Sequence, residues 1–314
     1  MSSSLVDAIQ ESIGVSEAQL KRLIARSPHS YKVYTIPKKS GGTRVIAQPA
    51  KETKFLQRWL MTNVFDRLPL HSSAVAYRSG ASIKLNAIAH KDNEYLSKFD
   101  FQQFFPSIKE SDLLAHFGRH LGDSFSAVDI KTMARLACIA GNSSKDLFLS
   151  IGAPSSPMLS NSIMYEFDCT IDLWCKLNEI VYTRYADDLA FSTNIKGISA
   201  EIEAKIASTI DSLQYPRLSL NKKKTIHLSK KYQRRITGLI INNESEISLG
   251  RARKREISTL VHRCSIGLLS SEQKYYLQGL LGFAKDVEPA FVMGLKGKYG
   301  AEVVDAVLQV RKNK

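Results

Sequence analysis

Residues 180–192 read IVYTRYADDLAFS and are the most informative part of the chain. Two apolar, strand-like runs, Ile180–Tyr185 and Leu189–Ser192, flank Ala186-Asp187-Asp188, which predicts a β-hairpin with two acids at its tip. Adjacent carboxylates repel one another unless a cation lies between them, and aspartate oxygens suit a hard ion such as Mg²⁺. Most Asp-Asp pairs are solvated turns, but the apolar runs on both sides indicate a tip that emerges from a core hairpin.

A third carboxylate is expected from Asp100, which lies 87 residues before Asp187. Tyr95–Asp100 reads as a short strand that ends in an acid, and the aromatic residues Phe101, Phe104 and Phe105 follow it. Three carboxylates can hold two metal ions about 4 Å apart, an arrangement that activates a hydroxyl and stabilises a leaving pyrophosphate. The alternative for Asp100 is a plain strand-terminating acid.

The charge of the chain points to a polyanionic partner. Its 314 residues include 44 Lys and Arg against 30 Asp and Glu, a net charge of +14. Residues 222–314 hold 19 of the basic and 8 of the acidic residues, a net charge of +11. This basic C-terminal third suggests nucleic acid or an anionic membrane as partner. A basic surface that only aids solubility is the alternative.

Cysteine spacing and hydropathy favour a cytoplasmic protein without a membrane partner. The four cysteines fit neither a zinc pattern nor a dense disulfide framework, so reduced thiols are expected. The first residues lack the basic stretch of a secretory signal. The longest uncharged run, Leu147–Tyr165, contains Pro154 and Pro157 and is therefore not a membrane span.

Hydrophobic spacing predicts the remaining elements. A helix is expected to begin with Ser156 as N-cap and Pro157 at its first position, because these residue types are favoured there. It would bury one face, formed by Leu159, Ile163, Phe167, Ile171 and Trp174. Other helices are expected at residues 5–25, 51–68, most of 110–141, 199–213 and much of the last 65 residues. The first of these should be broken around residues 14–16. The expected strand pairs are Tyr31–Ile36 with Arg44–Gln48, and 218–228 with 233–248.

Five ordered motifs resemble those of the reverse transcriptases. They are Asp100-x-x-x-x-Phe105, GAPSSP at residues 152–157, YADD at 185–188, Leu220-Asn221-x-x-Lys224-Thr225, and Thr237-Gly238. Two further features are similar to the bacterial retron reverse transcriptases: NAIAH at 86–90 resembles their NAxxH motif, and Ile236-Thr237-Gly238 resembles their VTG motif. The resemblance runs from about Tyr31 to about residue 250.

The resemblance implies an α+β fold of the right-hand polymerase type, with fingers, a palm built on an antiparallel sheet, and a helical thumb. The implied boundaries are an N-terminal helical segment at 1–30, fingers at 31–95 (with 110–150 shared between fingers and palm), the palm at 96–240, and a basic, RNA-binding thumb at 241–314. These parts account for all 314 residues and leave none for an RNase H domain, so removal of the template RNA is expected to need a host RNase H.

The resemblance also implies roles for single residues. Asp100, Asp187 and Asp188 would hold two Mg²⁺ ions, with Mn²⁺ as a substitute. Lys224 would protonate the leaving pyrophosphate; a plain phosphate-binding cluster with Lys222 and Lys223 is the alternative. The other residues would surround the incoming dNTP. The ring of Phe105 would exclude a ribose 2′-OH, or else Phe105 is a core residue. Arg44 and Lys38 would bind the triphosphate, and Gly152 and Pro154 would lie in the turn that supports the templating base and nucleotide.

RNA-binding residues are expected in two places. The resemblance links four residues to the cognate RNA: Asn86, His90, and Thr237 and Gly238, which fall at the primer grip of the family. Independently, Arg251, Lys254 and Arg255 lie at helical spacing, with Arg251 and Lys254 on one face and Arg255 beside it. Several of them could therefore reach one RNA backbone together. A solvated helix face is the alternative.

The function implied by the resemblance is that of a retron RNA-directed DNA polymerase. It would copy part of a structured noncoding RNA encoded beside it (msr-msd), prime from a guanosine 2′-OH, and leave branched multicopy single-stranded DNA (msDNA). Retrons act in antiphage defence with an effector protein encoded nearby. Two departures from the family pattern are Ile151, where many relatives have Gln, and Ile236, which replaces the usual Val.

Other classes of protein fit the sequence less well. A non-catalytic RNA-binding scaffold would not need three acids beside a polyanion. A group II intron reverse transcriptase would carry a maturase region, for which this chain has no room. A diversity-generating reverse transcriptase usually departs from the Ser-Pro ending of the turn at 152–157, and a viral replicase would show Gly before Asp-Asp.

Overall fold

The computed structural model describes residues 4–38, 41–141 and 146–310. Internal contacts divide the chain into two compact units. Unit 1 comprises Met1–Ala81 and Ser97–His227, and unit 2 comprises Ser82–Leu96 and Leu228–Lys314. The segment 82–96, expected in the fingers, thus packs with the C-terminal third of the chain. The boundaries of fingers, palm and thumb stay a prediction.

Two capped helices open unit 1. α1 (Leu5–Ile13) and α2 (Glu17–Arg26) each begin with a capping box, in which a serine and the residue three positions later exchange hydrogen bonds. Gly14 ends α1 in the left-handed conformation, with φ 67°, which glycine adopts without steric cost. The predicted break around residues 14–16 is confirmed.

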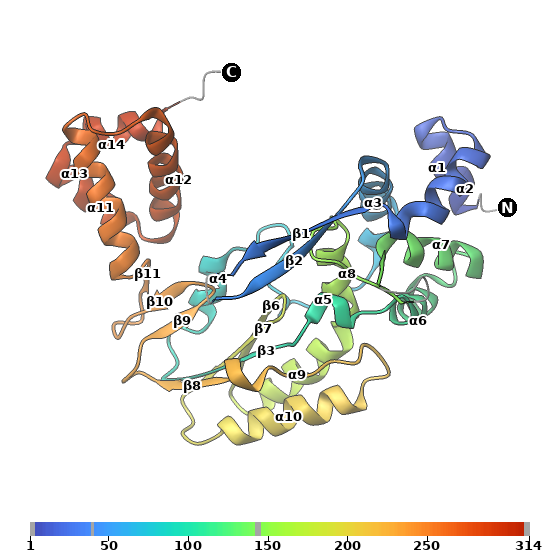
Figure 1. Cartoon of the computed structure of the whole chain (residues 1–314). Helices are drawn as coiled ribbons and strands as arrows, with labels where there is room; N and C mark the ends of the chain where they lie inside the picture. The colour runs from blue at the N-terminus through green and yellow to red at the C-terminus, as the bar shows by residue number, and fades with distance from the viewer. Residues whose placement is uncertain (1–3, 39–40, 142–145, 311–314) are drawn as a thin grey trace. The chain divides into compact units, whose positions relative to one another are not determined.

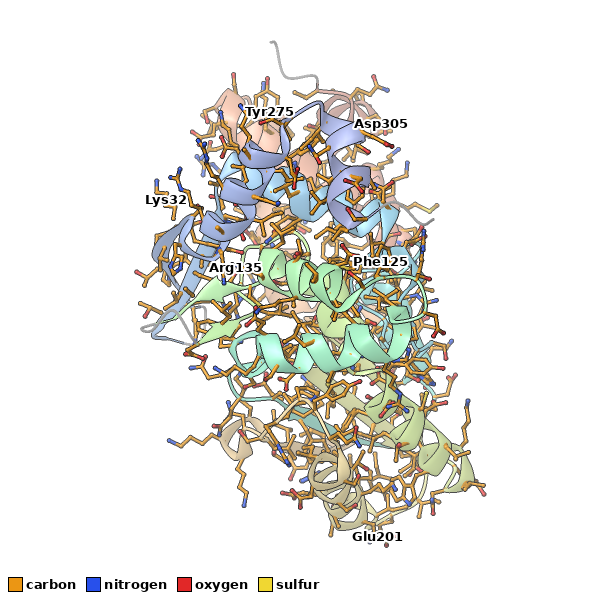
Figure 2. The ribbon with its side chains drawn as sticks, turned by 90° about the vertical axis from the view of Figure 1, so that its right-hand side faces the viewer. Lys32, Phe125, Arg135, Glu201, Tyr275 and Asp305 are labelled. Atoms are coloured by element: carbon orange, nitrogen blue, oxygen red, sulfur yellow. The ribbon has the colours of Figure 1, made fainter. Side chains whose placement is uncertain are left out.

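A long antiparallel hairpin follows, formed by β1 (Tyr31–Pro37) and β2 (Thr43–Pro49). Its register pairs Ile36 with Arg44. Most of its side chains are exposed, and Lys32 points away from the ribbon (Figure 2). The second strand is anchored near its end, where the Ala47 N–H donates to the Ile151 carbonyl at 2.8 Å.

The central sheet has the strand order β6-β7-β3-β8. β6 (Val181–Tyr185) and β7 (Asp188–Thr193) form the hairpin predicted from the YADD stretch, and β3 (Tyr95–Asp100) and β8 (Ile226–Ser229) complete the sheet. α9 (Tyr165–Leu177) and α10 (Ser199–Ser212) pack together along the sheet (Figure 1). Because β3 and β7 are neighbours, the end of β3 lies beside the tip of the hairpin.

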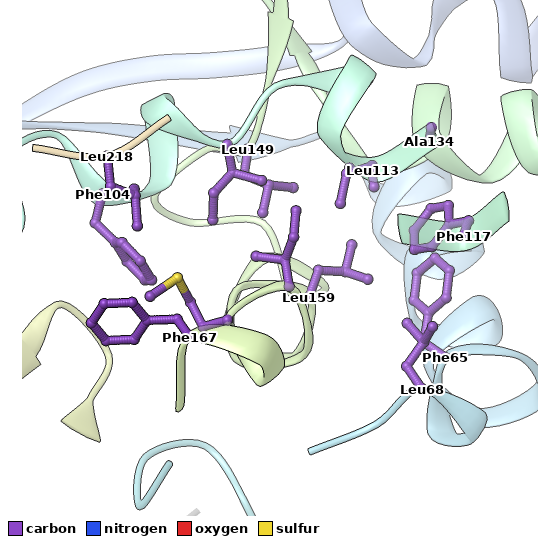
Figure 3. Packing of buried hydrophobic residues seen from close by; sticks show 14 of the residues in the cluster. Phe65, Leu68, Phe104, Leu113, Phe117, Ala134, Leu149, Leu159, Phe167 and Leu218 are labelled. Atoms are coloured by element: carbon purple, nitrogen blue, oxygen red, sulfur yellow. The ribbon is translucent and has the colours of Figure 1, made fainter. Parts of the chain in front are cut away.

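An apolar core fixes the end of β3 (Figure 3). Phe101, directly after Asp100, stacks on Phe104 with ring centroids 5.7 Å apart, and Phe167 packs edge-on against it at 5.6 Å. Elsewhere in the core Phe65 stacks on Phe117 at 5.3 Å. Each such buried side chain contributes about 1.5–3 kcal/mol to folding, so Asp100 is attached to a rigid part of the molecule.

The helix predicted from Ser156 to Trp174 is interrupted at Met164. α8 covers Ser156–Ile163 and α9 begins at Tyr165, and Ser155 is the N-cap residue instead of Ser156, without a side-chain capping bond. The spacing of apolar residues did not reveal the break because the same face is buried on both sides of it. That face includes Leu159, Ile163, Phe167 and Ile171.

The predicted pairing of residues 218–228 with 233–248 is wrong. β8 belongs to the central sheet, whereas β9 (Arg234–Ile236), β10 (Leu239–Ile241) and β11 (Ile247–Ser248) form a separate sheet of order β11-β10-β9. Thr237 and Gly238 have φ values of 46° and 88°, so the chain reverses at once and β10 pairs with β9. A local hairpin therefore replaces the expected longer-range pair.

The other helices lie close to their predicted positions. The region 51–68 divides into α3 (Lys51–Asn63) and the short η2 (Phe65–Arg67). The region 110–141 divides into α6 (Glu110–Leu121), α7 (Ala127–Ala137) and strand β4 (Ile139–Ala140). Strand β4 pairs with β5 (Leu147–Phe148). Short helices are η1 (Ser27–His29), α5 (Phe104–Ser107) and η3 (Lys222–Lys224). Unit 2 contains α4 (Ile83–Ala89), α11 (Arg251–Ser265), α12 (Ser271–Val287), α13 (Pro289–Tyr299) and α14 (Ala301–Leu308).

Within the described ranges, no helix has the length and apolar character needed to cross a membrane.

Candidate active site

The tip of the β6–β7 hairpin carries the two predicted acids. Tyr185 and Asp188 are the last opposed pair of the strands, so the turn consists of Ala186 and Asp187. Ala186 has φ 59°, an uncommon conformation for a residue with a Cβ atom. The two carboxylates therefore arise from consecutive residues, one in the turn and one at the first position of β7.

Backbone hydrogen bonds bring Asp100 to the same place. The Phe101 N–H donates to the Asp187 carbonyl at 3.1 Å, and the Asn221 N–H donates to the Asp100 carbonyl at 2.7 Å. The structure thus joins three of the predicted segments: the end of β3, the YADD turn, and the stretch that leads to Lys224.

The three carboxylates act on one another electrostatically. The Asp188 side chain touches solvent, yet the surrounding protein desolvates it; this effect, followed by the charge of Asp187, raises the pKa of Asp188 to about 6. Desolvation, and then the charge of Asp100, also raises the pKa of Asp187. The raised pKa values mean that desolvation and neighbouring negative charge disfavour the ionised carboxylates more than the nearby basic side chains stabilise them. The site therefore favours an added cation.

Lys224 supplies one cation, at Asp100. Its Nζ lies 2.8 and 2.9 Å from the two carboxylate oxygens. Burial opposes the charged ammonium, but the hydrogen bond to Asp100 and its charge prevail and raise the pKa of Lys224. The lysine side chain is 56% exposed, so its ammonium also has access to a ligand from solution.

A divalent metal ion is the other cation that suits these acids. Among the described residues, no three or more His, Cys, Asp or Glu side chains are gathered closely enough to hold one. The ammonium of Lys224 engages Asp100 instead. The donor chemistry nevertheless fits, because carboxylate oxygens that repel one another are suitable ligands for a hard divalent ion. Asp100, Asp187 and Asp188 are the residues that would hold it.

The turn that contains Gly152 and Pro154 is built against the β1–β2 hairpin. Gly152 has φ 121°, and a Cβ atom there would lie 2.9 Å from the Ala47 carbonyl, so a larger residue does not fit. Arg44 is exposed, and its charge counteracts the rise that burial causes in the pKa of Asp187. Lys38, at the end of β1, is exposed as well. Arg44 thus acts electrostatically on Asp187.

Phe104 and Phe105 are placed differently although they are adjacent. Phe104 is buried in the core, whereas Phe105 is half-buried and packs edge-on against it at 5.5 Å. A ring that is partly accessible just after the end of β3 suits contact with a nucleotide better than a fully enclosed one. Phe105 remains the candidate for sugar selection, and Phe104 takes the structural role.

Two features of this region were not predicted from the sequence. Tyr77 has φ 58°, is 52% exposed, and its ring lies 6.3 Å from that of Tyr185. Arg184, fully buried on β6, forms an ion pair with Asp168, also fully buried, at 2.5 Å. The sequence did hold a signal for the second feature, since a charged residue interrupts the apolar pattern both in this strand and on the buried face of α9.

Unit 2 contains the residues linked by resemblance to RNA. Asn86 and His90 are buried, and burial lowers the pKa of His90 to about 3. The Thr237 hydroxyl donates to the Ile83 carbonyl at 3.2 Å, which ties the β9–β10 turn to the start of α4. Gly238 is exposed in that turn. The histidine and asparagine side chains therefore support the interior of unit 2.

The three basic residues predicted on α11 do not share one environment. Arg251 and Arg255 are exposed, whereas the Lys254 ammonium forms an ion pair with Glu288 and lies 5.6 Å from the centre of the Phe291 ring. Lys254 thus contacts Phe291 on α13 and Glu288, which directly precedes that helix. The two arginines are the better candidates for contact with phosphates.

Comparisons with known proteins identify the family. The family model described as reverse transcriptase (RNA-dependent DNA polymerase) matches residues 36–241. The retron Ec83 reverse transcriptase of Escherichia coli is 37% identical over 288 residues, which cover 91% of this chain and 92% of that protein. The retron Ec73 reverse transcriptase of Escherichia coli is 36% identical over 292 residues, covering 89% and 90%.

A solved structure shows the same fold. The chain is similar to a telomerase from Candida albicans, determined with a fragment of telomeric RNA, with a TM-score of 0.51 and 12% identity. The match covers 90% of this chain and 55% of the telomerase chain, so this chain spans about half of that protein. The predicted right-hand polymerase fold is confirmed. The chain belongs to the reverse transcriptases, and among them to the retron reverse transcriptases, and it is an RNA-directed DNA polymerase.

Proposed function

We propose that this polymerase copies part of a structured noncoding RNA (msr-msd) encoded beside it, starts from the 2′-OH of a guanosine in that RNA, and produces branched msDNA. The observation that carries the proposal is that backbone hydrogen bonds join the segments of Asp100, the YADD turn and Lys224 at the end of β3, with Lys224 paired to Asp100, in a chain whose relatives are retron reverse transcriptases. Such a site suits transfer of a nucleotide to a hydroxyl group.

The three acids hold divalent metal ions, as reverse transcriptases generally do, and we assign Mg²⁺ with Mn²⁺ as a substitute. Bound there, the ions would activate the primer hydroxyl and stabilise charge on the pyrophosphate. The chain itself contributes position, because the backbone bonds of Phe101 and Asn221 fix the strand ends before substrate arrives. Lys224, kept protonated by Asp100, donates to the leaving pyrophosphate or binds it with Lys222 and Lys223.

The dNTP lies between this site and the β1–β2 hairpin. Arg44 binds the triphosphate, since a guanidinium can hold two phosphate oxygens at once, and Lys38 assists it. Gly152 and Pro154 support the templating base and nucleotide. Phe105 excludes the 2′-OH of a ribonucleotide.

The cognate RNA is held by the basic C-terminal third. Arg251 and Arg255 contact its backbone, and Lys254 holds α11 in place beside them. Thr237 and Gly238 present the β9–β10 turn to the RNA, with Asn86 and His90 supporting it from within. In the cytoplasm, a host RNase H would trim the template, and an effector protein encoded nearby would act with the msDNA in antiphage defence.

Synthesis from the purified protein and its noncoding RNA tests this function. With dNTPs and Mg²⁺, we expect labelled DNA that stays attached to the RNA, and that keeps one branched ribonucleotide after RNase digestion. A guanosine-to-adenosine change at the branch point should abolish the attached product. DNA that is synthesised but never joined to RNA would contradict the priming step while leaving the polymerase activity intact.

A further inference from the structure

A fully buried ion pair lies directly under the catalytic turn. Arg184 donates from Nε to Asp168 Oδ1 at 2.8 Å and from Nη2 to Oδ2 at 2.5 Å. The Tyr182 hydroxyl donates to Asp168 Oδ1 at 2.7 Å. Burying such a pair costs desolvation free energy, and well-packed apolar residues of similar volume are often at least as stable. Its presence therefore calls for a reason other than stability.

The other donors of Arg184 reach the turn and a second helix. Nη1 donates to the Ala186 carbonyl and to Asn161 Oδ1, both at 3.1 Å. The Ala186 carbonyl belongs to the same planar peptide as the Asp187 N–H. The guanidinium consequently sets the orientation of the peptide that leads into Asp187, in a turn where Ala186 has φ 59°.

Asn161 extends the network to the segment before Tyr77. Its Nδ2 donates to the Ala76 carbonyl at 2.7 Å. The Arg184 backbone is bound to that segment as well, since its N–H donates to Ser73 O at 2.7 Å and its carbonyl accepts from the Val75 N–H at 2.9 Å. Tyr77 also has a strained backbone, with φ 58°. One arginine thus connects the turn at Ala186 with the segment that leads to Tyr77, two places where a residue has left-handed backbone.

We propose that Arg184 is a positioning residue of the polymerase, which with Asp168 and Asn161 holds Asp187 and the exposed ring of Tyr77 in register for the primer end. The inference rests on the proposed catalytic role of Asp187. Residues with left-handed backbone persist only where their surroundings over-determine them, and this network supplies that constraint. Lysine cannot replace arginine here, because one ammonium cannot form the bidentate pair and also bind Asn161 and Ala186.

The test compares variants of one network in the full chain. Arg184→Lys keeps the charge but loses donors to the turn, and Asn161→Ala removes the link to Ala76. Tyr182→Phe is the matched control, because it removes one hydrogen bond from Asp168 and leaves the bonds to Ala186 intact. For each we measure the melting temperature, the single-turnover rate of the first nucleotide addition per folded molecule, and the dNTP concentration at half-maximal rate.

We expect Arg184→Lys and Asn161→Ala to reduce the rate about ten- to hundredfold, with a change of no more than about twofold in the half-maximal dNTP concentration. Tyr182→Phe should lower the melting temperature comparably but keep the rate. Wild-type rates in both test variants, or losses that follow melting temperature in all three, would overturn the inference. If Arg184→Lys does not fold, Asn161→Ala decides. An active Asp187→Asn protein would instead contradict the proposed site.

Discussion

Two ionic clusters lie at the two ends of residues 184–188, and their charges are balanced in different ways. Asp168 is fully buried but receives three hydrogen bonds from Arg184 and Tyr182. Asp188 reaches solvent, yet desolvation and the neighbouring Asp187 raise its pKa to about 6. The first cluster carries its own counter-charge, whereas the second has Lys224 and needs further cations. In the roles that we propose, the closed cluster fixes the geometry of the turn and the open cluster performs the chemistry.

Removing one charge from the open cluster should have the largest effect. Asp187→Asn keeps the size of the side chain but removes an anion needed for metal binding, so we expect DNA synthesis to fall about a thousandfold or more, roughly 4 kcal/mol in the barrier. Folding should be unchanged or slightly improved, because the pKa of Asp187 is raised in the folded protein by desolvation and Asp100. Primer extension and thermal melting measure both.

Asp211→Asn is the matched control, since it removes an exposed acid from α10. It should synthesise DNA at the wild-type rate. Normal synthesis by a folded Asp187→Asn protein would remove the YADD acids from the chemistry.

Breaking the closed cluster should instead cost stability. Asp168→Ala leaves the Arg184 guanidinium buried without its counter-charge, and we expect the free energy of unfolding to fall by about 3–5 kcal/mol. Glu17→Ala breaks an exposed pair with Lys21 and should cost about 1 kcal/mol or less. Urea unfolding compares the two. Equal losses would show that the buried pair is no more important to folding than a surface one.

The two adjacent aromatic residues sharpen the division between structural and chemical roles. Phe105→Ala should admit a ribose 2′-OH and relax the preference for deoxynucleotides about a hundredfold. Phe104→Leu should lower stability and leave sugar preference unchanged, because Phe104 is a core residue. Competition between dGTP and GTP in primer extension measures the ratio of deoxynucleotide to ribonucleotide incorporation. A Phe105→Ala protein with wild-type discrimination would assign that ring to packing.

Unit 2 shows the same contrast between paired and exposed charge. Arg251→Ala with Arg255→Ala should weaken RNA binding about tenfold at low salt and flatten the dependence of log K on log salt by about 0.7–0.9 for each lost phosphate contact. Lys254→Ala should lower the melting temperature and leave the salt slope close to that of the wild type, because the partner of Lys254 is Glu288. An unchanged slope in the double arginine variant would move the RNA surface away from α11.

A buried neutral base gives an expected effect that is confined to acidic pH. Burial, followed by the charge of His120, lowers the pKa of His116 to about 3 from 6.5. Below pH 6.5 the unfolded chain binds a proton that the folded chain does not. The free energy of unfolding therefore decreases as the pH is lowered from 6.5 toward 3, by up to about 1.4 kcal/mol per pH unit. His116→Gln should make the profile shallower, with buried His90 contributing the remainder, and the exposed His29→Gln should leave it unchanged. A wild-type profile in His116→Gln would contradict the burial argument.

The sequence predicted what depends on local pattern. The hairpin over 180–192, the strand ending at Asp100 and the N-terminal helices with a break around residues 14–16 follow from alternation and helical spacing, and all are present. Long-range partners were beyond these signals. Nothing near Lys254 indicates Glu288, nothing near residue 226 indicates that β8 pairs in the central sheet, and nothing near Asn86 shows that its side chain is buried.

The catalytic assignment shows the same limit. The positions of the three acids could be predicted, since Asp100 ends a strand, Asp187 lies in the hairpin turn and Asp188 begins the next strand. The residues that we propose to position Asp187 could not be predicted, because Arg184, Asp168 and Asn161 meet only after α8, α9 and β6 have packed. Charged residues inside apolar patterns were the one signal, and their meaning becomes clear only from the contacts.

Metal binding, measured without turnover, tests the contrast between the two clusters most directly. Mn²⁺ can be titrated into the protein with its RNA and followed by electron paramagnetic resonance. We expect binding in the wild type and in Tyr182→Phe, and a weakening of about tenfold or more in Asp187→Asn and in Asp100→Asn, because each loses one of the carboxylates that the ion requires. Equal Mn²⁺ affinity in all four proteins would contradict the assignment of Asp100 and the YADD acids as the metal-binding catalytic site.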